Sequence, residues 1–131
     1  MSTVDDRATL VLGGSGFVGR HLVARLVSAG RRVIVPTRQR EGARHLILLP
    51  TVDVLEVDIH DEAALARLVR RASVVVNLVG ILNERRRGEF ERVHVELTRK
   101  VVAACGMAKV SRLVHMITSN PVSLVTSQQR L

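Results

Sequence analysis

The sequence contains no tryptophan and no tyrosine, and Phe17 and Phe90 are its only phenylalanines. Hydrophobic residues nevertheless make up 47% of its 131 residues, so the chain can form one compact domain with an aliphatic core. The lack of tyrosine also excludes, within these residues, catalytic proton transfer by a phenol.

Cysteine is nearly absent as well. Cys105 is the single cysteine, which excludes an internal disulfide and any multi-cysteine metal site. The histidines are scattered without the spacing of metal ligands, so we predict no metal. They are His21, His45, His60, His94 and His115.

The sequence also lacks a secretory leader and any long apolar run. Residues 1–7 are polar and acidic, unlike the basic start of a signal peptide. Arg or Asp interrupts every apolar stretch well before the roughly 18 residues of a membrane span. We therefore expect a cytoplasmic protein, with peripheral contact at the inner face of the membrane as an alternative.

Acidic residues are in the minority, with 12 Asp and Glu against 20 Lys and Arg, a formal net charge of +8. A basic surface attracts phosphates, nucleic acid or anionic lipid. However, the dense run Arg85–Arg87 follows an expected strand and is interpreted as a solvated loop, and no helix carries a basic stripe with interleaved aromatics. Nucleic-acid or membrane-surface binding is therefore kept only as an alternative function.

What the sequence does contain is an alternation of apolar runs and helical patterns. Short apolar runs predict buried strands, and 3.6-residue periodicity predicts the helices between them. We expect an α/β fold of the Rossmann type, a doubly wound parallel sheet of about five strands in the order 3-2-1-4-5 with helices on both faces. The expected strands are 8–12, 33–37, 52–57, 73–79 and 110–116, and the expected helices are 17–29, 41–49, 62–71 and 90–106.

Three segments follow from this pattern. Residues 1–7 form a polar N-terminal extension, and residues 8–116 form the dinucleotide-binding domain. Residues 117–131 are rich in Ser, Thr and Gln and show no trustworthy period, so we expect an irregular tail, poorly ordered or added to a sheet edge. If the chain is truncated or frame-shifted here, the fifth strand would lie at an exposed edge, where self-association can occur.

The strongest functional signal is a glycine loop with the spacing G-x-x-G-x-x-G, directly after a strand and opening a helix. The first glycine permits a tight turn, the second a close approach of a pyrophosphate, and the third close helix packing. Free N–H groups and the helix dipole then favour a bound phosphate. The predicted cofactor contacts in this loop are Gly13, Ser15, Gly16, Phe17, Val18 and Gly19.

The end of the second expected strand bears on which dinucleotide binds. An acid there, about 20 residues after the loop, is typical of NAD binding. This strand instead ends Pro36-Thr37-Arg38, and an arginine suits the 2′-phosphate of NADP. We therefore predict NADP(H) rather than NAD(H), with a solvated Arg38 as the alternative.

These motifs together resemble the extended and atypical short-chain dehydrogenase/reductase superfamily, whose members are similar to NAD-dependent epimerases and dehydratases. The resemblance covers residues 8–116. Within the superfamily, the sequence most resembles the NADPH-binding accessory subunits of respiratory complex I and their bacterial relatives. It rests on the glycine loop, Arg38, 57–59, 77–80, 90–98 and 112–116.

The resemblance implies further cofactor contacts. Asp58 and Ile59 would flank the adenine, while Asn77, Val79 and Gly80 would line the end of the fourth strand near the adenine ribose. The alternatives are that Asp58 caps the next helix and that Asn77 only satisfies a strand end. His94 stands where relatives often have Asn, which puts a role for it in doubt.

Active members of this superfamily use a Tyr-x-x-x-Lys pair and a Ser or Thr after the fifth strand. This chain has no tyrosine, so we assign no catalytic residue, although Thr118 and Ser119 fall near the expected serine. The leading interpretation is a non-catalytic nucleotide-binding module with protein partners. The alternative is the cofactor-binding half of an epimerase, dehydratase or reductase whose substrate region is absent from this chain.

Overall fold

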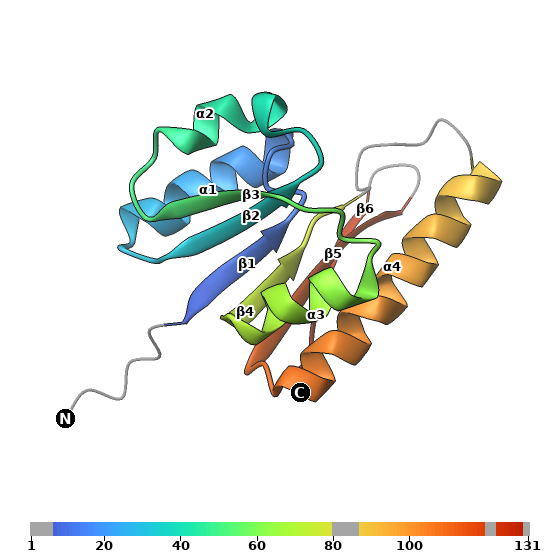
Figure 1. Cartoon of the computed structure of the whole chain (residues 1–131). Helices are drawn as coiled ribbons and strands as arrows, with labels where there is room; N and C mark the ends of the chain where they lie inside the picture. The colour runs from blue at the N-terminus through green and yellow to red at the C-terminus, as the bar shows by residue number, and fades with distance from the viewer. Residues whose placement is uncertain (1–6, 80–86, 120–122, 130–131) are drawn as a thin grey trace.

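The computed structural model describes residues 7–79, 87–119 and 123–129, which form a single sheet covered by helices on both faces (Figure 1). The strand order is β3-β2-β1-β4-β5-β6. The first five strands are parallel, which confirms the expected order 3-2-1-4-5. They are β1 (Ala8–Leu12), β2 (Val33–Thr37), β3 (Val52–Glu56), β4 (Ala72–Asn77) and β5 (Arg112–Ser119).

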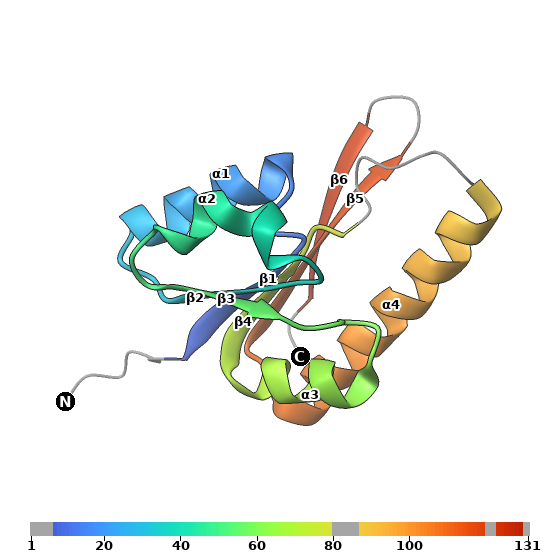
Figure 2. The ribbon, with the colours of Figure 1, turned by 45° about the horizontal axis from the view of Figure 1, so that its top comes forward.

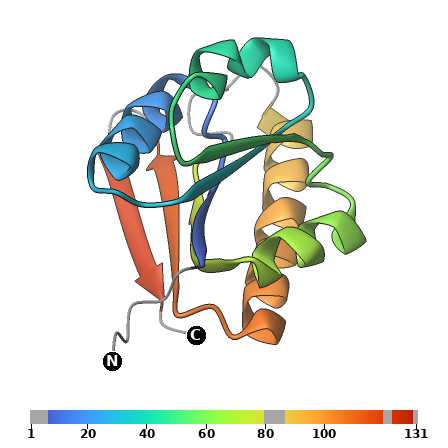
Figure 3. The same cartoon turned by 60° about the vertical axis from the view of Figure 1, so that its left-hand side comes forward.

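Two helical layers enclose the sheet, with α1 and α2 on one face and α3 and α4 on the other (Figures 2 and 3). Leu10 and Leu12 belong to the core cluster under α3 and α4, whereas Val11, between them, belongs to the cluster under α1 and α2. Both faces of β1 are thus buried, which explains its unbroken apolar run. The helices are α1 (Phe17–Ser28), α2 (Arg44–Ile47), α3 (Glu62–Arg70) and α4 (Arg87–Ala108).

The helix expected over 41–49 is shorter and interrupted. A 3-10 turn, η1 (Arg40–Ala43), precedes a single turn of α-helix, α2. Gly42 weakens helix formation, and Pro50 disfavours a helical conformation at the residue before it. This segment still supplies buried Ala43 and Leu46 to the core.

The expectation of an irregular tail is wrong for residues 117–119 and 123–129, which lie in strands, whereas the alternative of a segment added to a sheet edge describes what they do. β5 continues through Ser119, and β6 (Ser123–Gln129) pairs antiparallel with it from Ser119↔Ser123 to Leu113↔Gln129. A polar strand at a sheet edge has no long apolar run, so periodicity did not reveal it. β5 is therefore an interior strand, and the expected exposed edge at β5 is also wrong.

None of the helices in the described residues has the length and apolar character needed to cross a membrane.

Candidate nucleotide-binding site

The glycine loop joins β1 to α1 at the carboxyl ends of the parallel strands. Gly13 has a φ of +83°, which an L side chain rarely adopts. A Cβ at Gly13 would lie 3.0 Å from the carbonyl carbon of Leu78, just beyond β4. The loop therefore turns tightly while its backbone lies directly against the chain leaving β4.

Gly19 lets the helix approach the loop. A Cβ on Gly19 would lie 2.3 Å from the Gly13 carbonyl oxygen and 2.5 Å from the Gly14 Cα, distances that no side chain can occupy. The third glycine of the motif thus permits close packing as predicted, but its immediate neighbour is the loop itself.

Gly16 differs from both. Its φ of −76° and ψ of −177° are accessible to any residue, and a Cβ would meet only the Gly13 oxygen at 3.5 Å, an ordinary contact. Packing within the described residues therefore gives no reason for glycine at this position. A ligand approaching the backbone from outside would supply that reason.

Gly16 is also the N-cap of α1. No side chain in the described part of the chain caps this helix end, and its first turn carries no acidic residue. The N–H groups of the first turn and the helix dipole therefore favour an anion at this point.

The side chains of the loop divide between solvent and core. Phe17 is 64% exposed and its ring lies edge-on to His21, with centroids 5.1 Å apart. Ser15 is partly exposed, whereas Val18 packs against the core cluster under α1. Val18 can therefore offer a ligand its backbone N–H, while Phe17 offers an exposed ring.

Arg38 and Asp58 come together across the ends of β2 and β3. The Arg38 Nη2 atom lies 3.6 Å from the Asp58 Oδ1 atom, and both side chains are largely exposed. The same Oδ1 accepts a hydrogen bond from the His60 backbone N–H at 3.0 Å. The His60 N–H is the main cause that lowers the pKa of Asp58 below its usual value; desolvation opposes it, and the Arg38 charge adds to the lowering.

The helix that follows is capped by another residue. Asp61 is the N-cap of α3, and its side chain accepts from the N–H groups of Ala63 and Ala64. The alternative in which Asp58 caps this helix is therefore wrong. Ile59, between the two acids, is partly buried against the core under α3 and α4.

Asn77 at the end of β4 is fully buried and organises the strand end. Its Oδ1 accepts from the Val79 N–H at 3.1 Å, and its Nδ2 lies 3.1 Å from Nδ1 of His115 on β5. With Oδ1 accepting, Nδ2 is the donor in this contact and Nδ1 of His115 is the acceptor. Asn77 thus orients Val79, while Gly80 lies outside the described residues.

Two residues that support the site side chains are not among the predicted site residues. Lys100 of α4 donates from Nζ to the His60 carbonyl at 3.0 Å and so anchors the loop that carries Asp58. His115 supports Asn77. Each partner lies about 40 residues away in the chain, beyond the reach of motif spacing.

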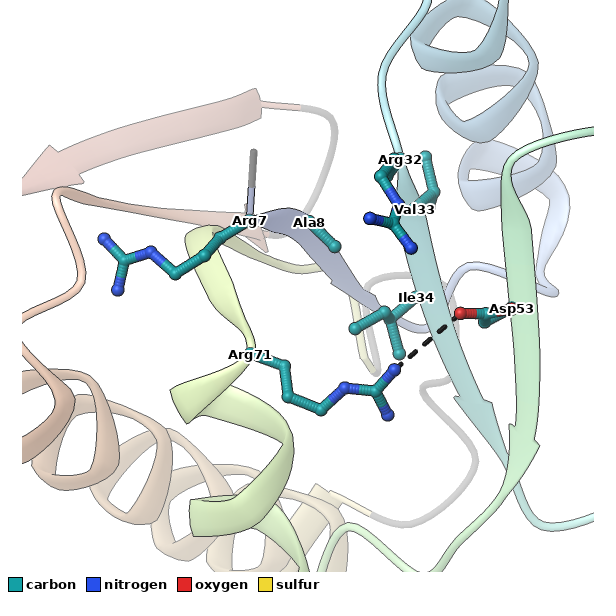
Figure 4. Close-up of a pocket in the computed structure, with 7 residues that line it drawn as sticks. All are labelled: Arg7, Ala8, Arg32, Val33, Ile34, Asp53 and Arg71. Atoms are coloured by element: carbon teal, nitrogen blue, oxygen red, sulfur yellow. Dashed lines mark ion pairs between the residues drawn. The ribbon is translucent and has the colours of Figure 1, made fainter. Parts of the chain in front are cut away.

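A second polar region lies at the amino ends of the parallel strands, where β1, β2 and β3 begin (Figure 4). It is a hollow of about 320 Å³. In Figure 4 the Arg32 and Arg71 side chains lie on either side of Ile34, Arg7 points away, and Arg71 pairs with Asp53 at 3.8 Å. This Arg71–Asp53 pair resembles the Arg38–Asp58 pair but is remote from the glycine loop.

No group of His, Cys, Asp and Glu in the described residues could hold a metal ion. The arrangement at the carboxyl ends of the strands instead suits a phosphate-bearing organic ligand.

This parallel sheet with a glycine loop between its first strand and helix defines an NAD(P)-binding domain of the Rossmann type. The chain belongs to the NAD dependent epimerase/dehydratase family, whose model matches residues 9–130. That assignment confirms the superfamily resemblance of the sequence.

Two mitochondrial proteins are similar in sequence to this chain. The mitochondrial "NADH dehydrogenase (ubiquinone) 1 alpha subcomplex subunit 9" of Mus musculus is 34% identical, over 99% of this chain and 35% of the mouse protein. The mitochondrial "NADH-ubiquinone oxidoreductase 40 kDa subunit" of Neurospora crassa is 30% identical, over 91% of this chain and 32% of its own length. The chain spans about a third of the length of these curated relatives.

A solved structure described as "MoeE5 in complex with UDP-glucose and NAD" is also similar. It superposes with a TM-score of 0.66 at 29% identity, over 82% of this chain and 35% of the MoeE5 chain. This chain again matches only about a third of a longer chain.

Proposed function

We propose that this chain binds NADP(H) in preference to NAD(H) at the carboxyl ends of β1 to β4 and does not itself turn the nucleotide over. The proposal rests on the start of α1, where Gly16 leaves open a helix end that no described side chain caps. The pyrophosphate would lie over this helix end.

The preference for NADP(H) rests on Arg38. It occupies the position after β2 where NAD-binding domains commonly carry an acid, and its side chain is 69% exposed. A planar guanidinium can bind a 2′-phosphate through two parallel hydrogen bonds. Asp58 and Ile59 would flank the adenine, while Val79, Gly80 and the buried Asn77 would shape the wall near the adenine ribose.

The non-catalytic role rests on the absence of tyrosine from these 131 residues. A Tyr-x-x-x-Lys pair would have to be supplied from outside them. The mouse and Neurospora relatives are named as mitochondrial subunits of an NADH dehydrogenase and an NADH-ubiquinone oxidoreductase. We infer a similar accessory role, with the nucleotide stabilising a module that binds other proteins.

An enzymatic role is the second candidate. The MoeE5 structure holds UDP-glucose and NAD by its description, so a longer protein containing this domain could act on a nucleotide sugar. Oxidation or reduction of bound nicotinamide in the presence of UDP-glucose would favour this candidate over the accessory role.

The direct test is titration of the purified chain with NADPH and NADH, followed by nicotinamide fluorescence. The chain has no tryptophan or tyrosine to interfere. We expect saturable binding of both, tighter for NADPH, and a loss of at least about tenfold in NADPH affinity in Arg38→Ala, since a charge-assisted contact is worth about 1.5–3 kcal/mol.

Arg32→Ala is the matched control, because it removes the same charge at the opposite, amino ends of the strands (Figure 4). It should leave both affinities unchanged. Equal losses in the two variants would mean that net charge, rather than a site at Arg38, attracts the nucleotide. No binding to folded wild-type protein would overturn the proposed function.

A further inference from the structure

We propose that Asp58 limits the preference for NADP(H) by competing with the 2′-phosphate for Arg38. This inference rests on the proposed function, since it concerns the same nucleotide site. It assigns Asp58 a specificity-determining role distinct from any contact with the adenine.

The carboxylate is the fixed partner of the pair. Asp58 accepts from the His60 N–H at 3.0 Å, and the His60 carbonyl is held by Lys100 Nζ at 3.0 Å. On the other side, the Val57 N–H donates to the Thr37 carbonyl at 3.0 Å and joins the ends of β3 and β2. The loop carrying Asp58 is therefore tied to both α4 and β2.

Arg38 is the movable partner. Its side chain is long, 69% exposed, and contacts Asp58 at 3.6 Å, beyond good hydrogen-bond distance. Exposed pairs of this kind are weak. Arg38 can thus leave Asp58 for a better anion, while Asp58 stays where it is.

The two nucleotides differ in what they meet there. The Asp58 carboxyl is ionised at neutral pH, as an exposed aspartate is, and the His60 backbone N–H lowers its pKa further. A 2′-phosphate that takes Arg38 adds a second anion beside this carboxylate and removes the cation that offsets it. A 2′-hydroxyl adds no charge and can donate to a carboxylate. Asp58 therefore penalises NADP(H) and leaves NAD(H) almost unaffected.

The test measures the ratio of the dissociation constants for NADH and NADPH in Asp58→Asn. Asparagine keeps the size and an acceptor oxygen but removes the charge, and any change in adenine contact affects both nucleotides alike. We expect the ratio to rise about fivefold, mostly through tighter NADPH binding.

Asp53→Asn is the matched control. Asp53 pairs with Arg71 at 3.8 Å and is similarly exposed, but it lies near the amino ends of the strands (Figure 4). The ratio should stay at its wild-type value. A rise equal to that of Asp58→Asn would overturn the inference in favour of a general charge effect.

Arg38→Ala combined with Asp58→Asn tests the competition itself. If Asp58 acts through Arg38, the gain from Asp58→Asn should shrink by at least half when Arg38 is absent. An undiminished gain, or an unchanged ratio in the single variant, would overturn the inference while leaving nucleotide binding established. Absence of binding in every variant would overturn the proposed function as well.

Discussion

At the scale of single residues, the three glycines of the motif have different physical roles. Gly13 is needed for its positive φ and Gly19 for the close approach of α1 to the loop. The conformation and surroundings of Gly16 tolerate a side chain. A side chain at Gly19 should therefore lower the stability of the fold, whereas one at Gly16 should lower ligand affinity.

Gly19→Ala should destabilise the fold by about 3 kcal/mol, the upper end of the cost of overpacking, because its Cβ would lie 2.3 Å from the Gly13 oxygen. Gly16→Ala should cost no more than about 1 kcal/mol, since alanine is only a poorer N-cap than glycine. Urea unfolding followed by circular dichroism measures both.

The nucleotide affinity of Gly16→Ala completes this prediction. We expect it to fall at least tenfold although the protein remains folded, because the new methyl group occupies the approach to the helix end. Unchanged affinity in this variant would contradict a phosphate site at α1.

Asn77 provides a second prediction at the residue scale. Asn77→Ala should lower the free energy of unfolding by about 2 kcal/mol, because it leaves the part-buried Val79 N–H and the His115 ring without this partner. Ser28→Ala removes an exposed hydrogen bond to the Ala24 carbonyl and should change stability by less than about 0.5 kcal/mol. Similar urea midpoints for the two variants would contradict the role assigned to Asn77.

At the scale of elements, the turn from β3 to α3 divides two tasks between neighbouring acids. Asp61 caps α3 through Ala63 and Ala64, whereas Asp58 faces Arg38 at the proposed nucleotide site. We therefore expect Asp61 to affect stability and Asp58 to affect nucleotide selectivity.

Asp61→Ala should destabilise the protein by about 1 kcal/mol through loss of the cap, and should leave the nucleotide selectivity unchanged. Asp58→Ala should do the reverse, changing the ratio of NADH and NADPH affinities with an unaltered melting temperature. Thermal unfolding and nicotinamide titration of the two variants test this division. A destabilised Asp58→Ala with an intact affinity ratio would reverse it.

At the scale of the whole molecule, the only cysteine reports on the core. Cys105 is fully buried in the cluster between α3, α4 and the sheet, and this burial raises the pKa of its thiol from 9.0 to about 11. The folded state therefore favours the protonated thiol. Its contribution to stability is complete below about pH 9 and is lost as the pH rises toward 11.

The free energy of unfolding should thus decline from about pH 9 to about pH 11, and the decline should be shallower in Cys105→Ala. With no tyrosine and only Lys100 and Lys109 among the lysines, few other groups titrate there. Urea unfolding across this pH range measures the slope. In the native protein the thiol should resist labelling until the chain unfolds; rapid labelling under native conditions would contradict its burial.

The sequence alone determined the five parallel strands, their order and the glycine loop, because apolar periodicity and glycine spacing are local properties of the chain. It also determined that these residues hold no tyrosine. Local patterns further located the start of α1 and its end, where Gly30 adopts a φ of +77°.

Only the tertiary structure decided which side chains meet. The polar strand β6 exists because β5 offers it a hydrogen-bonding edge, and Asp58 faces Arg38 because β2 and β3 end side by side. Asn77 is held by His115, and the loop after β3 by Lys100, across about 40 intervening residues. Such contacts depend on how distant segments pack, which no local pattern records.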